Sequence, residues 1–145
     1  MMKLPLIASL AAALALPAFA VAGGAERQHA FKQVLLDFEP MGLMVRERDP
    51  YKKDVFIKHA DALKLAARQP FTLFVPNSID GKSRAKPEIW SQPARFDAEK
   101  TRFLAAVDAL DGVARSGDLA AIKKSYAVVA QSCKSCHDSF RGPER

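Results

Sequence analysis

The chain has 145 residues, of which 49% are hydrophobic, and its formal net charge is +6 at pH 7. This length corresponds to one domain with a hydrophobic core and leaves little room for a second. The basic residues are scattered and form no Lys/Arg cluster with interleaved aromatic residues, so the pattern argues against nucleic-acid binding. The mild positive charge is typical of a solvated surface, although it would also suit an acidic redox partner protein.

Residues 1–22 have the pattern of a cleaved export signal. A positive start at Lys3 precedes an apolar stretch, and small residues then allow cleavage after Ala20 or Ala22. The alternative is an uncleaved membrane anchor, but the apolar stretch is shorter than the roughly 20 residues that span a bilayer comfortably. We therefore expect a periplasmic protein, with no membrane segment after signal cleavage and a single domain over residues 23–145.

The first two predicted helices cover residues 25–46 and 51–68, because apolar residues recur there at steps of three and four. The inward residues of the first helix are Phe31, Val34 or Leu35, Phe38, Met41 and Val45. Those of the second helix are Phe56, Ala60, Leu63 and Ala67. Asp49 is expected to cap the second helix and Pro50 to take its first position. Pro70 should end it, because the residue before a proline avoids helical geometry.

Residues 69–92 form one long connection. It contains several prolines together with the aromatic residues Phe71, Phe74 and Trp90. A connection of this length in a compact domain is usually functional or disordered. The aromatic residues favour an ordered segment that packs on the rest of the protein.

The third predicted helix covers residues 93–115, with Ser91 as a possible cap, and Gly117 and Asp118 separate it from the fourth. Its inward residues are Phe96, Phe103, Val107 and Leu110. The fourth helix covers residues 119–141. Its apolar seam, with alternating steps of three and four, is Leu119, Ile122, Tyr126, Val129, Cys133, Cys136 and Phe140. Since no stretch alternates with period two, the predicted fold is all-α, an up-down-up-down antiparallel four-helix bundle.

The segment Cys133-Lys134-Ser135-Cys136-His137 is the attachment signature of c-type haem. Two thiols three residues apart on a helix project to the same side, where they can add to the two vinyl groups of one haem. The histidine that follows brings an imidazole nitrogen beneath the iron. We therefore predict one covalently attached haem c near the C-terminal end of the last helix, with His137 as the axial iron ligand.

Three other interpretations of the two cysteines are weaker. A thioredoxin-like redox pair belongs in a βαβ context, and the sequence shows no strand pattern. A structural zinc site needs four ligands, whereas only three candidates are clustered. A simple disulfide would be poorly placed between two core positions of one helix.

The sequence offers no strong sixth ligand for the iron. None of the residues after His137 is a methionine or histidine, so a ligand would have to come from upstream. Met41 lies roughly 15 Å along the helix from Phe31, which suits a core residue better. His29 lies about 200° around the helix from Phe31 and should face solvent. His59 belongs to the middle of the second helix, well away from the level of the haem. Since none of these residues is placed to bind the iron, Phe31 is the residue predicted to lie over it.

From residue 27 to residue 141 the sequence resembles the cytochrome c′ family, the class II c-type cytochromes. The matching segments are Arg27-Gln28, Asp49-Pro50-Tyr51, Lys86-Pro87-Glu88-Ile89-Trp90, Ser116-Gly117-Asp118-Leu119 and QSCKSCHDSFR at residues 131–141. The resemblance implies that Arg27, Gln28 and Glu88 line the haem edge and its propionates. It also implies that Arg141 lies beside His137.

The same resemblance bears on the state of the iron. Low-spin members of the family have a methionine at the position of Phe31, whereas members with an apolar residue there have five-coordinate iron. Phe31 therefore predicts a five-coordinate, high-spin haem. The resemblance also suggests a homodimer that forms through the first two helices.

An open ferrous iron behind an apolar wall suits small neutral diatomic gases, because the wall excludes bulky or charged ligands. Similar proteins bind nitric oxide and carbon monoxide. We therefore expect a gas-binding haem protein and not an enzyme. A single-electron carrier is the alternative, and fixed six-coordinate iron would favour it. Peroxidase activity is disfavoured because a distal His or Arg acid–base pair is lacking.

Overall fold

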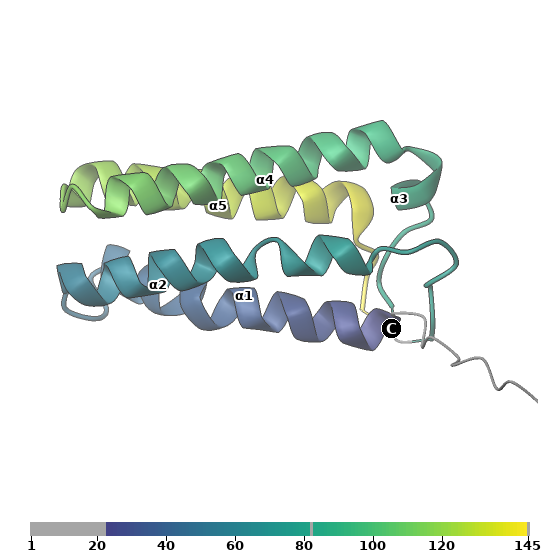
Figure 1. Ribbon diagram of the computed structural model, residues 1–145, viewed down its shortest axis with the longest axis horizontal. Helices are drawn as coiled ribbons and strands as arrows, with labels where there is room; N and C mark the ends of the chain where they lie inside the picture. Colours follow the sequence, from purple (N-terminus) through teal and green to yellow (C-terminus); the bar gives the residue numbers. More distant parts are fainter. Residues whose placement is uncertain (1–22, 82, 145) are drawn as a thin grey trace, which may run out of the picture.

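The structure, a computed structural model, describes residues 23–81 and 83–144. The predicted export signal lies outside this range. The long helices of the described part are α1 (Gly24–Val45), α2 (Lys53–Ala66), α4 (Pro93–Ala114) and α5 (Leu119–Phe140). They run alternately in opposite directions, with α1 and α2 on one side of the bundle and α4 and α5 on the other (Figure 1). The predicted all-α four-helix bundle is confirmed.

Among the described residues, no helix is long and apolar enough to cross a membrane. The inward stripes predicted for α2 and α4 are buried throughout. In α1 the ambiguity between two neighbours is resolved, because Val34 is buried and Leu35 is 44% exposed. The helix also continues through Pro40, as the apolar spacing predicted.

The second helix begins later than the sequence predicts. Asp49 was expected to be its cap and Pro50 its first residue, but α2 begins at Lys53 with Lys52 as the N-cap. The prediction is wrong because the backbone N–H of Asp49 donates to the carbonyl of Leu43 over 3.3 Å. This bond keeps Asp49 at the end of α1.

The turn between α4 and α5 forms as predicted. Gly117 has a φ of +74°, the left-handed conformation that favours glycine after a helix. Asp118 Oδ1 accepts hydrogen bonds from the backbone N–H groups of Ala120 (2.9 Å) and Ala121 (3.2 Å), so it caps α5. These local interactions fix where the last helix starts and therefore which of its residues reach the opposite end.

The described part of the long connection packs on the bundle and contains two short helices, η1 (Gln69–Leu73) and α3 (Glu88–Ser91). Ser91 was predicted as a possible cap of the third long helix, but it is the last residue of α3, and Gln92 is the N-cap of α4. The prediction fails because residues 87–91 close a helical turn of their own, in which Ser91 N–H donates to Pro87 O over 3.1 Å.

The segment after α5 pairs with this connection. Lys86 N–H donates to the carbonyl of Phe140 over 3.0 Å, and Gly142 N–H donates to that of Arg84 over 2.7 Å. An isolated antiparallel bridge joins Ala85 and Arg141. These bonds attach the last turn of α5 to the connection, at the end of the bundle where α1 begins (Figure 1).

Candidate functional site

The two cysteines face the interior from the last turns of α5. Both are free thiols and half-buried. Cys133 packs against the large core cluster of the bundle, whereas Cys136 packs against a smaller cluster formed by Ile89, Phe96 and Phe140. Because residues three apart on a helix share a face, the two sulfur atoms lie on the same side of α5.

The surroundings of these thiols are unlike those of a reactive redox pair. Burial raises the pKa of Cys133. Burial, the carboxylate of Glu99 and the neighbouring Cys133 raise the pKa of Cys136 to about 11. Disulfide oxidoreductases instead lower the pKa of a cysteine so that it is a thiolate at neutral pH. Neither thiol has the lowered pKa of such a pair, which weakens the thioredoxin-like interpretation further.

His137 lies in the last turn of α5 and its side chain is exposed. Partial desolvation, followed by the positive charges of Arg141 and Arg84, lowers its pKa. A neutral imidazole keeps one ring nitrogen free to bind a metal. Arg141 directly follows the helix, and its backbone N–H donates to the carbonyl of His137 over 3.0 Å.

Phe31 lies near the start of α1. This helix begins at the end of the bundle where α5 ends (Figure 1). The half-buried ring of Phe31 meets two rings of the connection edge to face. The centroid of Phe71 is 6.0 Å away at an interplanar angle of 83°, and that of Phe74 is 6.3 Å away at 67°. An apolar aromatic wall therefore stands at the end that carries the cysteines.

Arg27 is buried with only 4% of its surface exposed. Its Nη1 donates to Ser78 Oγ (2.7 Å) and Leu73 O (3.1 Å), and its Nη2 donates to Ser78 O (2.8 Å) and Ser83 Oγ (2.8 Å). All four terminal N–H hydrogens of the guanidinium thus have an acceptor in the connection. Burial lowers the pKa of this side chain.

Two further residues that were predicted to line the haem pocket are more exposed than Arg27. Gln28 lies on an exposed face of α1, and Glu88 is half-buried as the first residue of α3. Their predicted contact with the haem edge stays a prediction, as do the roles of Arg27 and Arg141.

The methionines and histidines that could supply a sixth iron ligand occupy other positions among the described residues. Met41 is fully buried and Met44 is 6% exposed, both within the large core cluster. His59 Nδ1 is 3.0 Å from Asp37 Oδ1, a contact between α2 and α1. His29 is exposed, as its position on the helix predicted.

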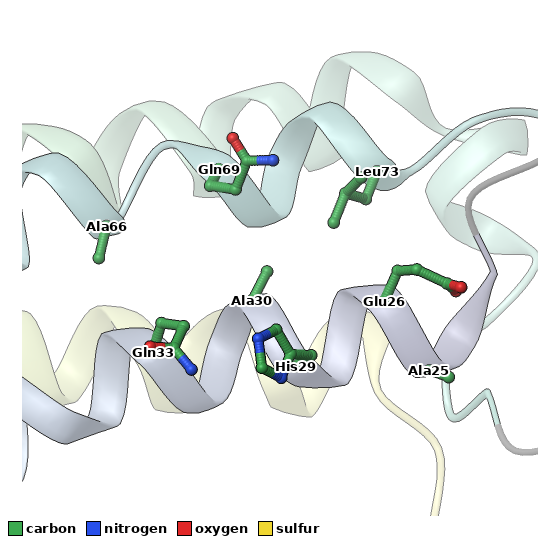
Figure 2. Close-up of a pocket in the computed structure, with 8 residues that line it drawn as sticks. All are labelled: Ala25, Glu26, His29, Ala30, Gln33, Ala66, Gln69 and Leu73. Atoms are coloured by element: carbon green, nitrogen blue, oxygen red, sulfur yellow. The ribbon is translucent and has the colours of Figure 1, made fainter.

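His29 lines a groove of about 660 Å³ between α1 and the α2–η1 segment. Its lining residues are Ala25, Glu26, His29, Ala30, Gln33, Ala66, Gln69 and Leu73. Figure 2 shows Ala30 and Leu73 pointing toward each other across this groove. Because α5 contributes no lining residue, the groove is separate from the site of the cysteines.

Sequence reasoning missed the partners of Arg27. Ser78 and Ser83 lie 51 and 56 residues from it along the chain, and Asp80 accepts a 2.6 Å bond from Gly24 N–H at the start of α1. The turn-prone residues of this segment signal a loop, but no local pattern indicates which helix the loop contacts.

The comparisons with known proteins agree with this architecture. The family model described as Cytochrome C' matches residues 24–141. The cytochrome c′ of Rubrivivax gelatinosus is 34% identical over 116 residues, covering 79% of this chain and 90% of the relative. That of Cereibacter sphaeroides is 36% identical over an alignment of 152 residues, covering 97% and 98%.

Solved structures give the same result. A variant of the cytochrome c′ from Alcaligenes xylosoxidans, solved as its nitric oxide complex, matches with a TM-score of 0.77 and 30% identity. The match covers 81% of this chain and 91% of that one. A helical bundle with an inward-facing cysteine pair and an adjacent histidine defines a class of haem proteins. The chain belongs to the cytochrome c′ family, which implies a haem c cofactor.

Proposed function

We propose that this chain is a periplasmic gas-binding protein with one five-coordinate, high-spin haem c, and that it binds nitric oxide and carbon monoxide without turning them over. Cys133 and Cys136 would hold the haem covalently, and His137 would bind its iron. The observation that carries the proposal is the aromatic wall of Phe31, Phe71 and Phe74. Phe31 lies near the start of α1, and the cysteines lie near the end of α5.

The donor set fits this cofactor. Two free thiols lie on one side of α5, next to an imidazole whose pKa is lowered, which favours a ring nitrogen that can bind a metal. When bound, the haem supplies an iron that takes up a diatomic ligand. His137 would bind that iron, while Cys133 and Cys136 fix its position relative to α5.

The wall supports the proposed preference for small neutral gases. Phenyl rings offer no hydrogen-bond donor to stabilise bound dioxygen, and they exclude charged or bulky ligands. The described methionines and histidines upstream of the motif lie in the core, in a groove or in hydrogen-bonding contact with Asp37. Structures of the Alcaligenes xylosoxidans relative have nitric oxide and carbon monoxide bound, which supports the same ligands here.

The proposal includes a homodimer that forms through α1 and α2. Large apolar residues are exposed on these helices, among them Leu36 (64%) and Leu65 (80%). Contiguous exposed apolar patches often mark association surfaces. Sedimentation equilibrium of the mature protein tests this part, and a monomer at micromolar concentration would contradict it.

Absorption spectra of the ferric and ferrous protein, recorded with and without nitric oxide and carbon monoxide, test the function. We expect a high-spin ferrous spectrum that changes on addition of either gas. A ferrous protein that is already six-coordinate and low-spin would overturn the proposal. It would support instead a single-electron carrier for a periplasmic redox partner, since fixed ligands keep reorganisation small.

A further inference from the structure

We propose that Phe71 and Phe74, the second of which is held in place by Arg27, control how readily Phe31 moves aside and therefore how fast a diatomic gas reaches the iron. The inference rests on the proposed function, because it assumes that Phe31 lies over the iron. It adds three positioning residues, Phe71, Phe74 and Arg27, which act on gas entry through Phe31.

The first step is the contact between the rings. Phe31 comes from α1, whereas Phe71 and Phe74 come from the connection, and both meet Phe31 edge to face at 6.0 and 6.3 Å between centroids. Edge-to-face geometry is a favoured arrangement of aromatic pairs. The ring of Phe31 can therefore move toward the connection only if these two rings shift or these contacts break.

The second step is what lies behind the two rings. The centroid of Phe96 is 4.9 Å from that of Phe74 and 6.2 Å from that of Phe71, and the centroid of Phe103 is 5.9 Å from that of Phe71. Both supporting residues belong to α4 and are buried. Because protein interiors are closely packed, the loop rings have little room to retreat from Phe31.

The third step is the attachment of the loop to α1. The Cζ atom of Arg27 lies 5.1 Å from the centroid of Phe74, and the guanidinium donates to acceptors on both sides of this residue, at Leu73 and Ser78. Trp90 Nε1 donates to the carbonyl of Phe74 over 3.2 Å. Phe74 is thus held by its ring, its carbonyl and the flanking backbone.

Arg27 and Phe31 are four residues apart on α1, so they lie on the same face of that helix. The four bonds of Arg27 go to serine hydroxyls and backbone carbonyls, which are uncharged. A buried cation is costly unless its hydrogen bonds are satisfied. Loss of part of this set should therefore loosen the loop rings, and with them the wall against which Phe31 packs.

The test is the association rate of carbon monoxide with the ferrous holoprotein, measured after flash photolysis. In Phe74→Leu we expect association to become roughly three- to tenfold faster, because one edge-to-face contact of Phe31 is removed. The double variant Ser78→Ala/Ser83→Ala keeps every ring and Arg27 itself, and we expect a smaller acceleration in the same direction. Phe56→Leu is the matched control, since it removes a fully buried ring near the start of α2.

A double-mutant cycle separates positioning from general loosening. In a Phe31→Ala background, Phe74→Leu should leave the association rate unchanged, because the residue that it restrains has gone. An acceleration of equal size in both backgrounds would overturn the inference. The inference would also be overturned if Phe31→Ala made association faster while Phe74→Leu and Ser78→Ala/Ser83→Ala both left the association rate unchanged. A wild-type ferrous spectrum that is already six-coordinate would overturn the proposed function and this inference together.

Discussion

The two ends of the bundle are built differently. At the end with the short turns, Met41, Phe56, Leu110 and Ile122 are fully buried in one continuous core. At the other end the cysteines and Phe31 are only half-buried, and rings of the connection supply much of the packing. The first end is packed as a folding core, whereas the second exposes its chemically active side chains in part. Stability and ligand binding should therefore respond to different substitutions.

The largest expected effect is loss of the cofactor. Cys133→Ala/Cys136→Ala should release the haem under acid-acetone extraction, because no thioether remains to hold it, while Cys133→Ala alone should retain it through one bond. The pyridine haemochrome spectrum of the extracted protein measures this. Phe56→Leu, a change at the other end, should retain all of its haem. Haem that stays with the double cysteine variant after denaturation would contradict the assignment of the attachment site.

A core substitution at the end with the short turns should affect the stability of the fold and leave ligand binding unchanged. Leu110→Ala should lower the free energy of unfolding by about 2–5 kcal/mol, because it leaves a cavity in a fully buried position. Urea denaturation followed by circular dichroism measures this loss. The absorption spectrum and carbon monoxide affinity of the folded variant should match those of the wild type. A changed spin state in Leu110→Ala would show that the two ends are not independent.

Substitutions of Phe31 should instead change ligand binding and the coordination of the iron. Phe31→Ala removes two aromatic contacts worth about 0.5–1.5 kcal/mol each, so carbon monoxide affinity should rise by roughly 5- to 150-fold if an incoming ligand must break both. Phe31→Met should supply a thioether and convert the iron to a six-coordinate, low-spin state. Equilibrium titration and absorption spectra measure the two effects. An unchanged affinity in Phe31→Ala would show that this ring does not cover the iron.

The smallest effect concerns an ion pair between α2 and α4. Asp111 is 5% exposed and accepts bonds from Lys64 (2.9 Å) and Arg115 (2.6 Å). Burial alone would raise its pKa, but the hydrogen bonds and positive charges of these partners lower it overall. Asp111→Asn should therefore cost about 1–2 kcal/mol at pH 7, a modest amount because both partners are partly exposed.

The pH dependence of this cost follows from the sign of the shift. A carboxylate with a lowered folded pKa contributes its full stability above its unfolded pKa of about 3.9. The contribution is lost as the pH falls through the lower folded value. The difference in unfolding free energy between wild type and Asp111→Asn should thus be constant from neutral pH to about pH 5 and shrink below pH 4. A difference that grew on acidification would contradict the lowered pKa.

Several features of the fold were predicted correctly because their causes are local. The burial of Phe56 and Leu110 follows from helical spacing, and the last turn before α5 follows from a glycine and an aspartate that act on their neighbours. The start of α2 was wrong because Asp49 has two possible partners. Its side chain is suited to cap the next helix, but its backbone is bonded to Leu43 of the previous one.

The sequence by itself determined the helical bundle, the cysteine pair with its histidine, and the presence of an aromatic residue, Phe31, near the start of the first helix. Each of these depends on residue type and short-range spacing, which helical geometry converts directly into position. Only the tertiary structure decided that Arg27 binds Ser78 and Ser83 and that Phe71 and Phe74 meet Phe31. These contacts join residues 40 or more positions apart, so they depend on how the connection folds over the end of the bundle, which no local pattern specifies.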